Sequence, residues 1–126
     1  MAKKTVVEVT VKMPGIHFWA DAKPPVEYLR DKHRHTFHFT ARKQVLGLDR
    51  EIEFIQLRRN IISHLEAEHF GDSESLDFDG MSCEMLAQEL VEAFTLASCT
   101  VSEDGEFGAT VYADTSHTLN CFEICD

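Results

Sequence analysis

The sequence predicts an α+β fold in the order ββααββ, an antiparallel sheet with two helices on one of its faces. Three observations lead to this prediction. Residues 33–45 read as a β-strand, because His33, His35, Phe37, Phe39 and Ala41 alternate with Arg34, Thr36, His38, Thr40 and Arg42. Apolar residues then recur at helical spacing in two successive segments, and alternation returns after the second of them. Strands on either side of two amphipathic helices favour a helix layer packed over a sheet.

The first strand is expected over 5–13, because its residues alternate between apolar and polar. The Pro14-Gly15 pair is expected to end this strand, and residues 16–32 to form a loop or a short strand. The second strand is expected over 33–45. The residues that would share the buried face of the first strand are Val7, Val9, Val11 and Met13.

The first helix is expected over 50–69, because isoleucines and leucine recur there at helical spacing and acidic residues occupy its beginning. An acidic loop is expected to follow up to Gly80. The second helix is expected from Ser82, a favourable N-cap, to Phe94. Its apolar stripe, which we interpret as core packing, comprises Cys83, Leu86, Ala87, Leu90, Val91 and Phe94.

Two further strands are expected near 97–103 and 107–113, with a turn at 104–106 between them. A four-stranded sheet leaves two unpaired edges, and association with other copies is one way to close them. We therefore expect a homo-oligomer. The whole arrangement predicts a single domain over 3–114, followed by a C-terminal tail at 115–126.

Composition restricts the class of protein. The chain has 126 residues, of which 44% are hydrophobic and 27% charged, as in ordinary soluble domains. No apolar run approaches the length of a membrane span, and the first residues lack the apolar core of a signal peptide. These features predict a cytoplasmic protein with no membrane partner. In a reducing compartment the four cysteines are expected to be free thiols, with a Cys121–Cys125 pair or metal site as the alternative.

The net charge of −10 argues against a nucleic acid duplex as partner, because phosphate binding needs a basic surface. Basic residues are nevertheless dense at 30–43 and at 58–59. They would serve a small anionic ligand such as a triphosphate, or else form solvated faces.

Three histidines predict a metal site. His33 and His35 project from the same face of the predicted strand, since side chains two residues apart point the same way. His17 lies far enough upstream to return on a neighbouring strand. Three imidazoles with a fourth position open to water or substrate are typical of catalytic Zn²⁺. The alternative is a set of histidines at the surface or core edge without metal. Trp19, beside His17, is expected to pack on the sheet rather than to stack on a ligand.

Four segments, in order, resemble motifs of one enzyme family. Residues 33–37 (HRHTF) resemble its His-Gly-His-Asn-Tyr, and residues 49–54 (DREIEF) its Gly-Met-Val-x-Asp-Phe. Residues 81–87 (MSCEMLA) resemble its Pro-Thr-x-Glu-Asn-Leu-Ala. Residues 99–104 (CTVSED) and 109–112 (ATVY) are similar to its closing Val-x-Val-x-Glu-Thr and Ala-x-Tyr. The family is that of 6-pyruvoyl-tetrahydropterin synthase and 6-carboxy-tetrahydropterin synthase (QueD), and the resemblance covers roughly residues 5–113.

The resemblance implies a tetrahydropterin-synthase-like T-fold and a zinc-dependent lyase that acts on 7,8-dihydroneopterin triphosphate or a related pterin, as in pterin or queuosine biosynthesis. It implies that Glu103 grips the pterin ring, since a carboxylate can accept two parallel N–H bonds from a 2-amino-pyrimidinone edge. Guanine offers the same edge. Glu84, in the second-helix motif, would also bind substrate. The resemblance further implies trimers that close a barrel and pair into hexamers, with sites at subunit interfaces.

The chain also departs from the family pattern. The family has a cysteine base in the loop before His-x-His, and no cysteine precedes His33 here. Asp31 is the candidate replacement, and Glu68-His69 is a loose counterpart of the family's proton-handling Asp-His pair. Arg34 stands where the family has glycine, and would shield the metal or contact phosphate. These departures leave a second hypothesis open, a non-catalytic protein that binds a pterin or guanine nucleotide. A third is a structural oligomer with incidental histidines.

Overall fold

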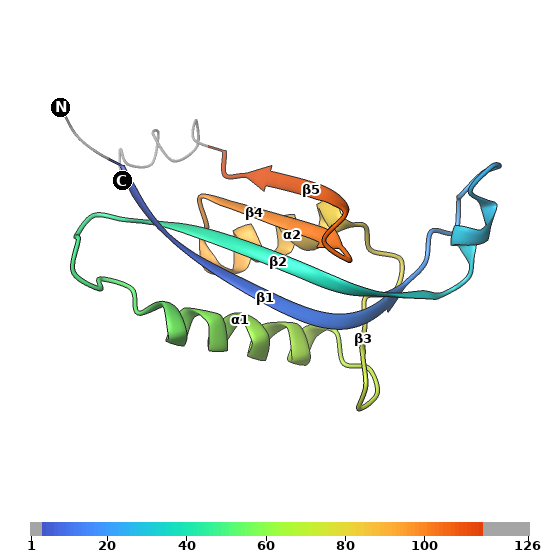
Figure 1. Ribbon diagram of the computed structural model, residues 1–126, viewed down its shortest axis with the longest axis horizontal. Coiled ribbons are helices and arrows are strands. Elements are labelled where there is room, and N and C mark those ends of the chain that lie inside the picture. Colours follow the sequence, from blue (N-terminus) through green and yellow to red (C-terminus); the bar gives the residue numbers. More distant parts are fainter. Residues whose placement is uncertain (1–3, 115–126) are drawn as a thin grey trace.

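The computed structural model describes residues 4–114, which form one five-stranded sheet and two α-helices that pack against it (Figure 1). The strand order in the sheet is β3-β1-β2-β4-β5. The mixed α+β class is therefore confirmed. The elements are β1 (Thr5–His17), a 3₁₀ turn η1 (Glu27–Arg30), β2 (His33–Val45), α1 (Phe54–Glu68), β3 (Leu76–Asp77), α2 (Cys83–Phe94), β4 (Ser98–Glu103) and β5 (Phe107–Tyr112).

A long antiparallel hairpin of β1 and β2 forms the centre of the sheet. Thr5 pairs with Val45 at one end and His17 with His33 at the other, without interruption. The prediction that Pro14-Gly15 ends the first strand is therefore wrong. Within residues 4–114, no strand pairs with the outer side of β1 before Gly15, and an edge position tolerates the missing N–H of proline.

One face of the sheet carries the core. The register places Val9 beside Ala41 and Val11 beside Phe39, and Phe39 in turn beside Val101 of β4. These side chains point to the helices, and both helices contribute to the same buried cluster. The sheet is therefore covered on one face by α1 and α2, as predicted. The helical members of the cluster are Leu57, Ile61, Leu65, Cys83, Leu86, Ala87, Leu90 and Val91.

Both helices begin at a capping side chain. Ser82 accepts a hydrogen bond from the Met85 amide, so the predicted N-cap of α2 is confirmed. The first helix begins at Phe54 rather than at residue 50. The Glu53 carboxylate caps it by accepting from two amides of the first turn, and Arg50 has a positive φ that ends any earlier helical turn.

The loop between the helices contains a strand that the sequence did not indicate. Leu76 and Asp77 pair in parallel with Gly15 and Ile16 of β1. The expectation of an unpaired loop and of an entirely antiparallel sheet is therefore wrong at this edge. Two residues are too few to show alternation, which is why the pattern was not visible.

No helix within residues 4–114 is long and apolar enough to cross a membrane. The predicted tail at 115–126, with the Cys121–Cys125 alternative, lies outside the described residues.

Candidate metal centre

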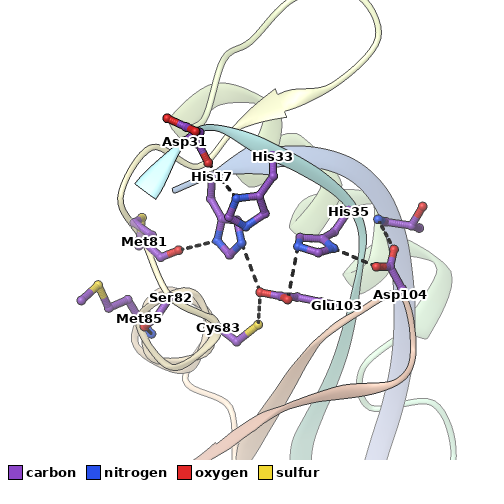
Figure 2. A network of polar contacts seen from close by, with 11 residues as sticks. His17, Asp31, His33, His35, Met81, Ser82, Cys83, Met85, Glu103 and Asp104 are labelled. Atoms are coloured by element: carbon purple, nitrogen blue, oxygen red, sulfur yellow. Dashed lines mark hydrogen bonds and ion pairs between the residues drawn. The ribbon is translucent and has the colours of Figure 1, made fainter. Parts of the chain in front are cut away.

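Three histidines meet at one end of the β1–β2 hairpin (Figure 2). His17 and His33 are direct cross-strand partners, and His35 lies two residues further along β2 on the same face. Their ring centroids are separated by 4.6, 5.0 and 5.4 Å. One candidate ligand atom from each ring lies within 4.8 Å of the other two. The predicted convergence is confirmed, and the cluster can hold a metal ion.

Every ring of the cluster makes a hydrogen bond through Nδ1 to an oxygen. Because a carbonyl or carboxylate oxygen accepts, Nδ1 carries a proton in each ring, and in the neutral imidazole Nε2 is then the atom with the free lone pair. Histidines that bind metals through Nε2 are oriented in this way by an oxygen behind the ring. The three bonds run from His17 to the Met81 carbonyl at 2.9 Å, from His33 to the Asp31 carbonyl at 2.9 Å, and from His35 to the Asp104 carboxylate at 2.8 Å.

The Glu103 carboxylate faces the Nε2 atoms of two of these rings. Its oxygens lie 3.1 Å from Nε2 of His17 and 3.3 Å from Nε2 of His35. Two acceptors at this distance repel each other unless a proton or a cation lies with them. Burial lowers the pKa of His17 below its ordinary value, which disfavours a second proton on that ring.

His35 shows the same situation from the side of the ring. Its Nε2 is buried and makes no hydrogen bond among residues 4–114, although the Glu103 carboxylate lies 3.3 Å away, and such atoms require an explanation. Two ligands of one tetrahedral zinc-sized ion, each about 2.1 Å from it, lie about 3.4 Å apart. The Glu103 carboxylate lies at about that spacing from the two nitrogens, so a cation held by the histidines would have this carboxylate beside its open position.

A tight turn supplies Asp104 to the cluster. Asp104 and Gly105 both have positive φ, which reverses the chain between β4 and β5. The Asp104 carboxylate accepts from the Thr36 amide as well as from His35, and these hydrogen bonds hold its pKa below the ordinary value. The carboxylate therefore stays ionised and keeps the His35 ring in position.

Two core phenylalanines, Phe37 and Phe78, lie next to the histidine cluster. The Phe37 ring contacts the rings of His17 and His35 edge to face, with centroids 5.1 and 5.8 Å away. Phe78 packs against Phe37 at 4.8 Å. A Cβ on Gly15 would meet the Phe78 ring at 2.4 Å, so a glycine is required at this position in β1.

A cavity of about 480 Å³ opens beside the cluster. Glu103 and His17 belong both to the cluster and to the cavity wall. Trp19 also lines the cavity and is 53% exposed, so the expectation that it packs on the sheet is wrong. The remaining lining residues are Phe18, Gly80, Met81, Ser82, Cys83, Glu84, Met85, Phe107, Gly108 and Ala109.

Three other residues that the sequence predicted for the site, Asp31, Arg34 and Glu84, lie in different surroundings. Asp31 reaches the cluster through its main-chain carbonyl, whereas Figure 2 shows its carboxylate pointing away from the histidines. Arg34 is exposed and alternates with His33 and His35, so it projects from the opposite face of the sheet. Glu84 lines the cavity at the first turn of α2.

The Glu68-His69 pair lies outside the cluster. Glu68 is exposed at the end of α1. His69 is buried, its Nε2 lies 2.9 Å from the Glu89 carboxylate, and its ring contacts Phe78. His64 binds the same carboxylate at 2.8 Å. Within one chain, His69 therefore links α1 to α2 and does not face the metal cluster.

Cys83 is one residue of the site that the sequence did not indicate, because it lies in the apolar stripe of α2. Its thiol is 3.8 Å from Glu103 and lines the cavity. Burial, followed by the nearby carboxylates, raises the pKa of this thiol to about 12. The residue therefore carries its proton at neutral pH.

We expect neither Cys83 nor Cys99 to react with iodoacetamide in the native protein at about pH 8, because a thiol is nucleophilic only as the thiolate. Burial raises the pKa of Cys99 to about 12 as well. Both should react after unfolding in denaturant. Mass mapping of labelled peptides measures each site separately, and fast native labelling of Cys83 would show that its surroundings differ from those described.

No protein-family model matches this chain, and a search of curated proteins finds no match.

Proposed function

We propose that this chain binds Zn²⁺ through His17, His33 and His35 and is a lyase of the tetrahydropterin-synthase type, with the corresponding T-fold. Its substrate would be 7,8-dihydroneopterin triphosphate or a related pterin. The observation that carries the proposal is the histidine cluster beside a cavity whose wall includes His17, the Glu103 carboxylate and aromatic side chains. When bound, zinc would supply Lewis-acid polarisation of the substrate side-chain oxygens.

Glu103 is the proposed anchor of the heterocycle. Its carboxylate borders both the cluster and the cavity, and it can accept two parallel N–H bonds from a 2-amino-pyrimidinone edge. A ring held in this way would lie between Trp19, Phe18 and Phe107, which line the same cavity. Flat aromatic sides and a single polar edge are suited to a planar ligand.

Proton transfer is where this proposal needs a second copy of the chain. Neither the Asp31 carboxylate nor His69 faces the cluster within one chain. In a homo-oligomer, trimeric or hexameric, a neighbouring copy would bring a further acid or base to the cavity mouth.

A second candidate function is a protein that binds a pterin or a guanine nucleotide without converting it. The state of Cys83 favours this candidate, because its thiol is protonated and hydrogen-bonded to Glu103 rather than activated. A site with a metal, an anchor and no activated base would bind a heterocycle and leave it unchanged.

One experiment separates the two candidates. The zinc-loaded protein is incubated with 7,8-dihydroneopterin triphosphate and with 7,8-dihydroneopterin, and the products are followed by mass spectrometry with trapping of released aldehyde. Zinc-dependent loss of the side chain, abolished in Glu103→Gln, is expected for the lyase. Binding without conversion would leave the second candidate, and absence of both would reject the proposed function.

A further inference from the structure

The three histidines of the cluster differ in what holds their rings. His17 and His33 donate from Nδ1 to neutral main-chain carbonyls. His35 donates instead to a carboxylate, that of Asp104, at 2.8 Å. A hydrogen bond to a charged acceptor is stronger than one to a neutral acceptor, and a carboxylate behind a metal-binding imidazole makes the ring a better ligand. The three rings are therefore unequal, and His35 is the one that this difference favours as a metal ligand.

The Asp104 carboxylate is anchored to the residue next to His35. The Asp104 amide donates to the Thr36 carbonyl at 2.8 Å, and the Thr36 amide donates to Oδ1 of Asp104 at 2.9 Å. Oδ2 is then left to accept from Nδ1 of His35 (Figure 2). Because Thr36 directly follows His35 on β2, the carboxylate and the ring are fixed to the same short piece of strand.

The turn between β4 and β5 suits an aspartate at this position. Asp104 has a φ of 58° and Gly105 a φ of 72°, and aspartate adopts such a left-handed conformation more readily than most residues with a side chain. In the motif that residues 99–104 resemble, threonine occupies the position of Asp104. The resemblance therefore implies no role for this carboxylate, and its contact with His35 is a feature of this chain.

Asp104 can act on a metal only through the ring that it holds. Its carboxylate meets His35 at Nδ1, whereas the atom that faces Glu103 is Nε2. Asp104 is also absent from the lining of the cavity beside the cluster. These positions separate it from Glu103, which borders both the cluster and the cavity.

We propose that Asp104 is a positioning residue of the metal centre, which holds the His35 ring with a proton on Nδ1 and Nε2 free, and thereby raises the affinity of the cluster for Zn²⁺. This inference rests on the zinc site of the proposed function and adds a residue to it. The Asp104 side chain is 45% exposed, so solvent screens part of its charge. Its contribution to zinc affinity is therefore about tenfold, the lower end of the range for residues that orient metal-binding histidines.

Asp104→Asn is the variant that tests this role. Asparagine has the same shape and tolerates positive φ, but it carries no charge and offers one oxygen to the two N–H groups. Zinc affinity of the full-length protein, measured by competition with a chromophoric chelator, should fall about tenfold. Glu106→Gln is the matched control, because it removes an exposed carboxylate two residues further along the chain, and it should leave the affinity unchanged.

A spectroscopic readout separates positioning of the ring from general damage to the fold. Long-range proton–nitrogen NMR of the metal-free protein at about pH 8.5, where imidazoles are ordinarily neutral, shows which ring nitrogen carries the proton. His35 of the wild type should carry it on Nδ1. In Asp104→Asn this form of His35 should lose population, whereas His17 and His33 should keep theirs. Should Asp104→Asn fold poorly, Asp104→Gly also accepts positive φ and gives the same comparison.

The outcomes distinguish this inference from the proposed function. Wild-type zinc affinity in Asp104→Asn would overturn the role of Asp104 and leave the zinc site in place. An equal loss of affinity in Glu106→Gln, or a His35 ring whose proton stays on Nδ1 in Asp104→Asn, would do the same. Wild-type protein that binds no zinc would reject the proposed function and this inference together.

Discussion

Substitution of one cluster histidine is expected to remove the metal. In His35→Ala, zinc content should fall from about one ion per chain to near zero after dialysis. Loss of a residue that merely orients a ligand costs about 10–100-fold in metal affinity, so loss of the ligand itself should cost at least that much. The measurement is zinc by plasma mass spectrometry, together with a competition titration against a chromophoric chelator.

His38→Ala is the matched control for this experiment. His38 lies on the same strand, and strand alternation places it on the opposite face from His35. Its loss should leave zinc content unchanged. If the two variants retained zinc equally, the metal would lie elsewhere in the protein.

Phe37→Ala is expected to cause the largest loss of stability. Its side chain is fully buried and contacts Phe39 and Phe78 as well as two of the histidine rings. Removal of a buried phenylalanine costs about 3–5 kcal/mol in the free energy of unfolding. Zinc affinity should fall in parallel, because the histidine rings lose the surface on which they rest. Urea denaturation of the metal-free protein gives the first quantity.

Phe70→Ala removes the same group from an exposed position. Phe70 is 85% exposed, so its loss should change the free energy of unfolding by less than about 0.5 kcal/mol. Should Phe37→Ala fail to fold, Phe37→Leu gives a smaller loss that remains measurable. An equal loss in the free energy of unfolding for Phe37→Ala and Phe70→Ala would contradict the burial of Phe37 in the core.

The parts of the fold that repeat a pattern over many residues could be predicted from the sequence. Alternation over 33–45 predicted β2 and, with it, the common direction of His33 and His35. The apolar stripe and Ser82 predicted α2. These features depend on local periodicity, which each segment carries by itself.

The parts that depend on the tertiary structure could not be predicted. Pro14 is typical of a strand end in sequence. Its place inside β1 depends on the partly open edge of that strand, which only the tertiary structure shows. Asp104 could be assigned to a turn, but its bond to His35 follows from the pairing of β2 with β4. Cys83 fits the core pattern of its helix and also contacts Glu103, so periodicity alone assigned it to the core.

The proton-handling residues show the limit of sequence comparison most clearly. Glu68-His69 matched the family pair only by position along the chain. In the structure the His69 ring belongs to a different contact, with Glu89 on α2. That contact joins residues 20 positions apart and has no counterpart in the local sequence pattern.

The central claim is that His17, His33 and His35 bind zinc through their Nε2 atoms. Zinc K-edge absorption spectroscopy of the purified wild-type protein tests it most directly. The account predicts one zinc per chain with about three imidazole nitrogens at about 2.0–2.1 Å and oxygen in the remaining position. A spectrum with sulfur ligands at about 2.3 Å, or purified protein that binds no zinc on titration, would contradict it.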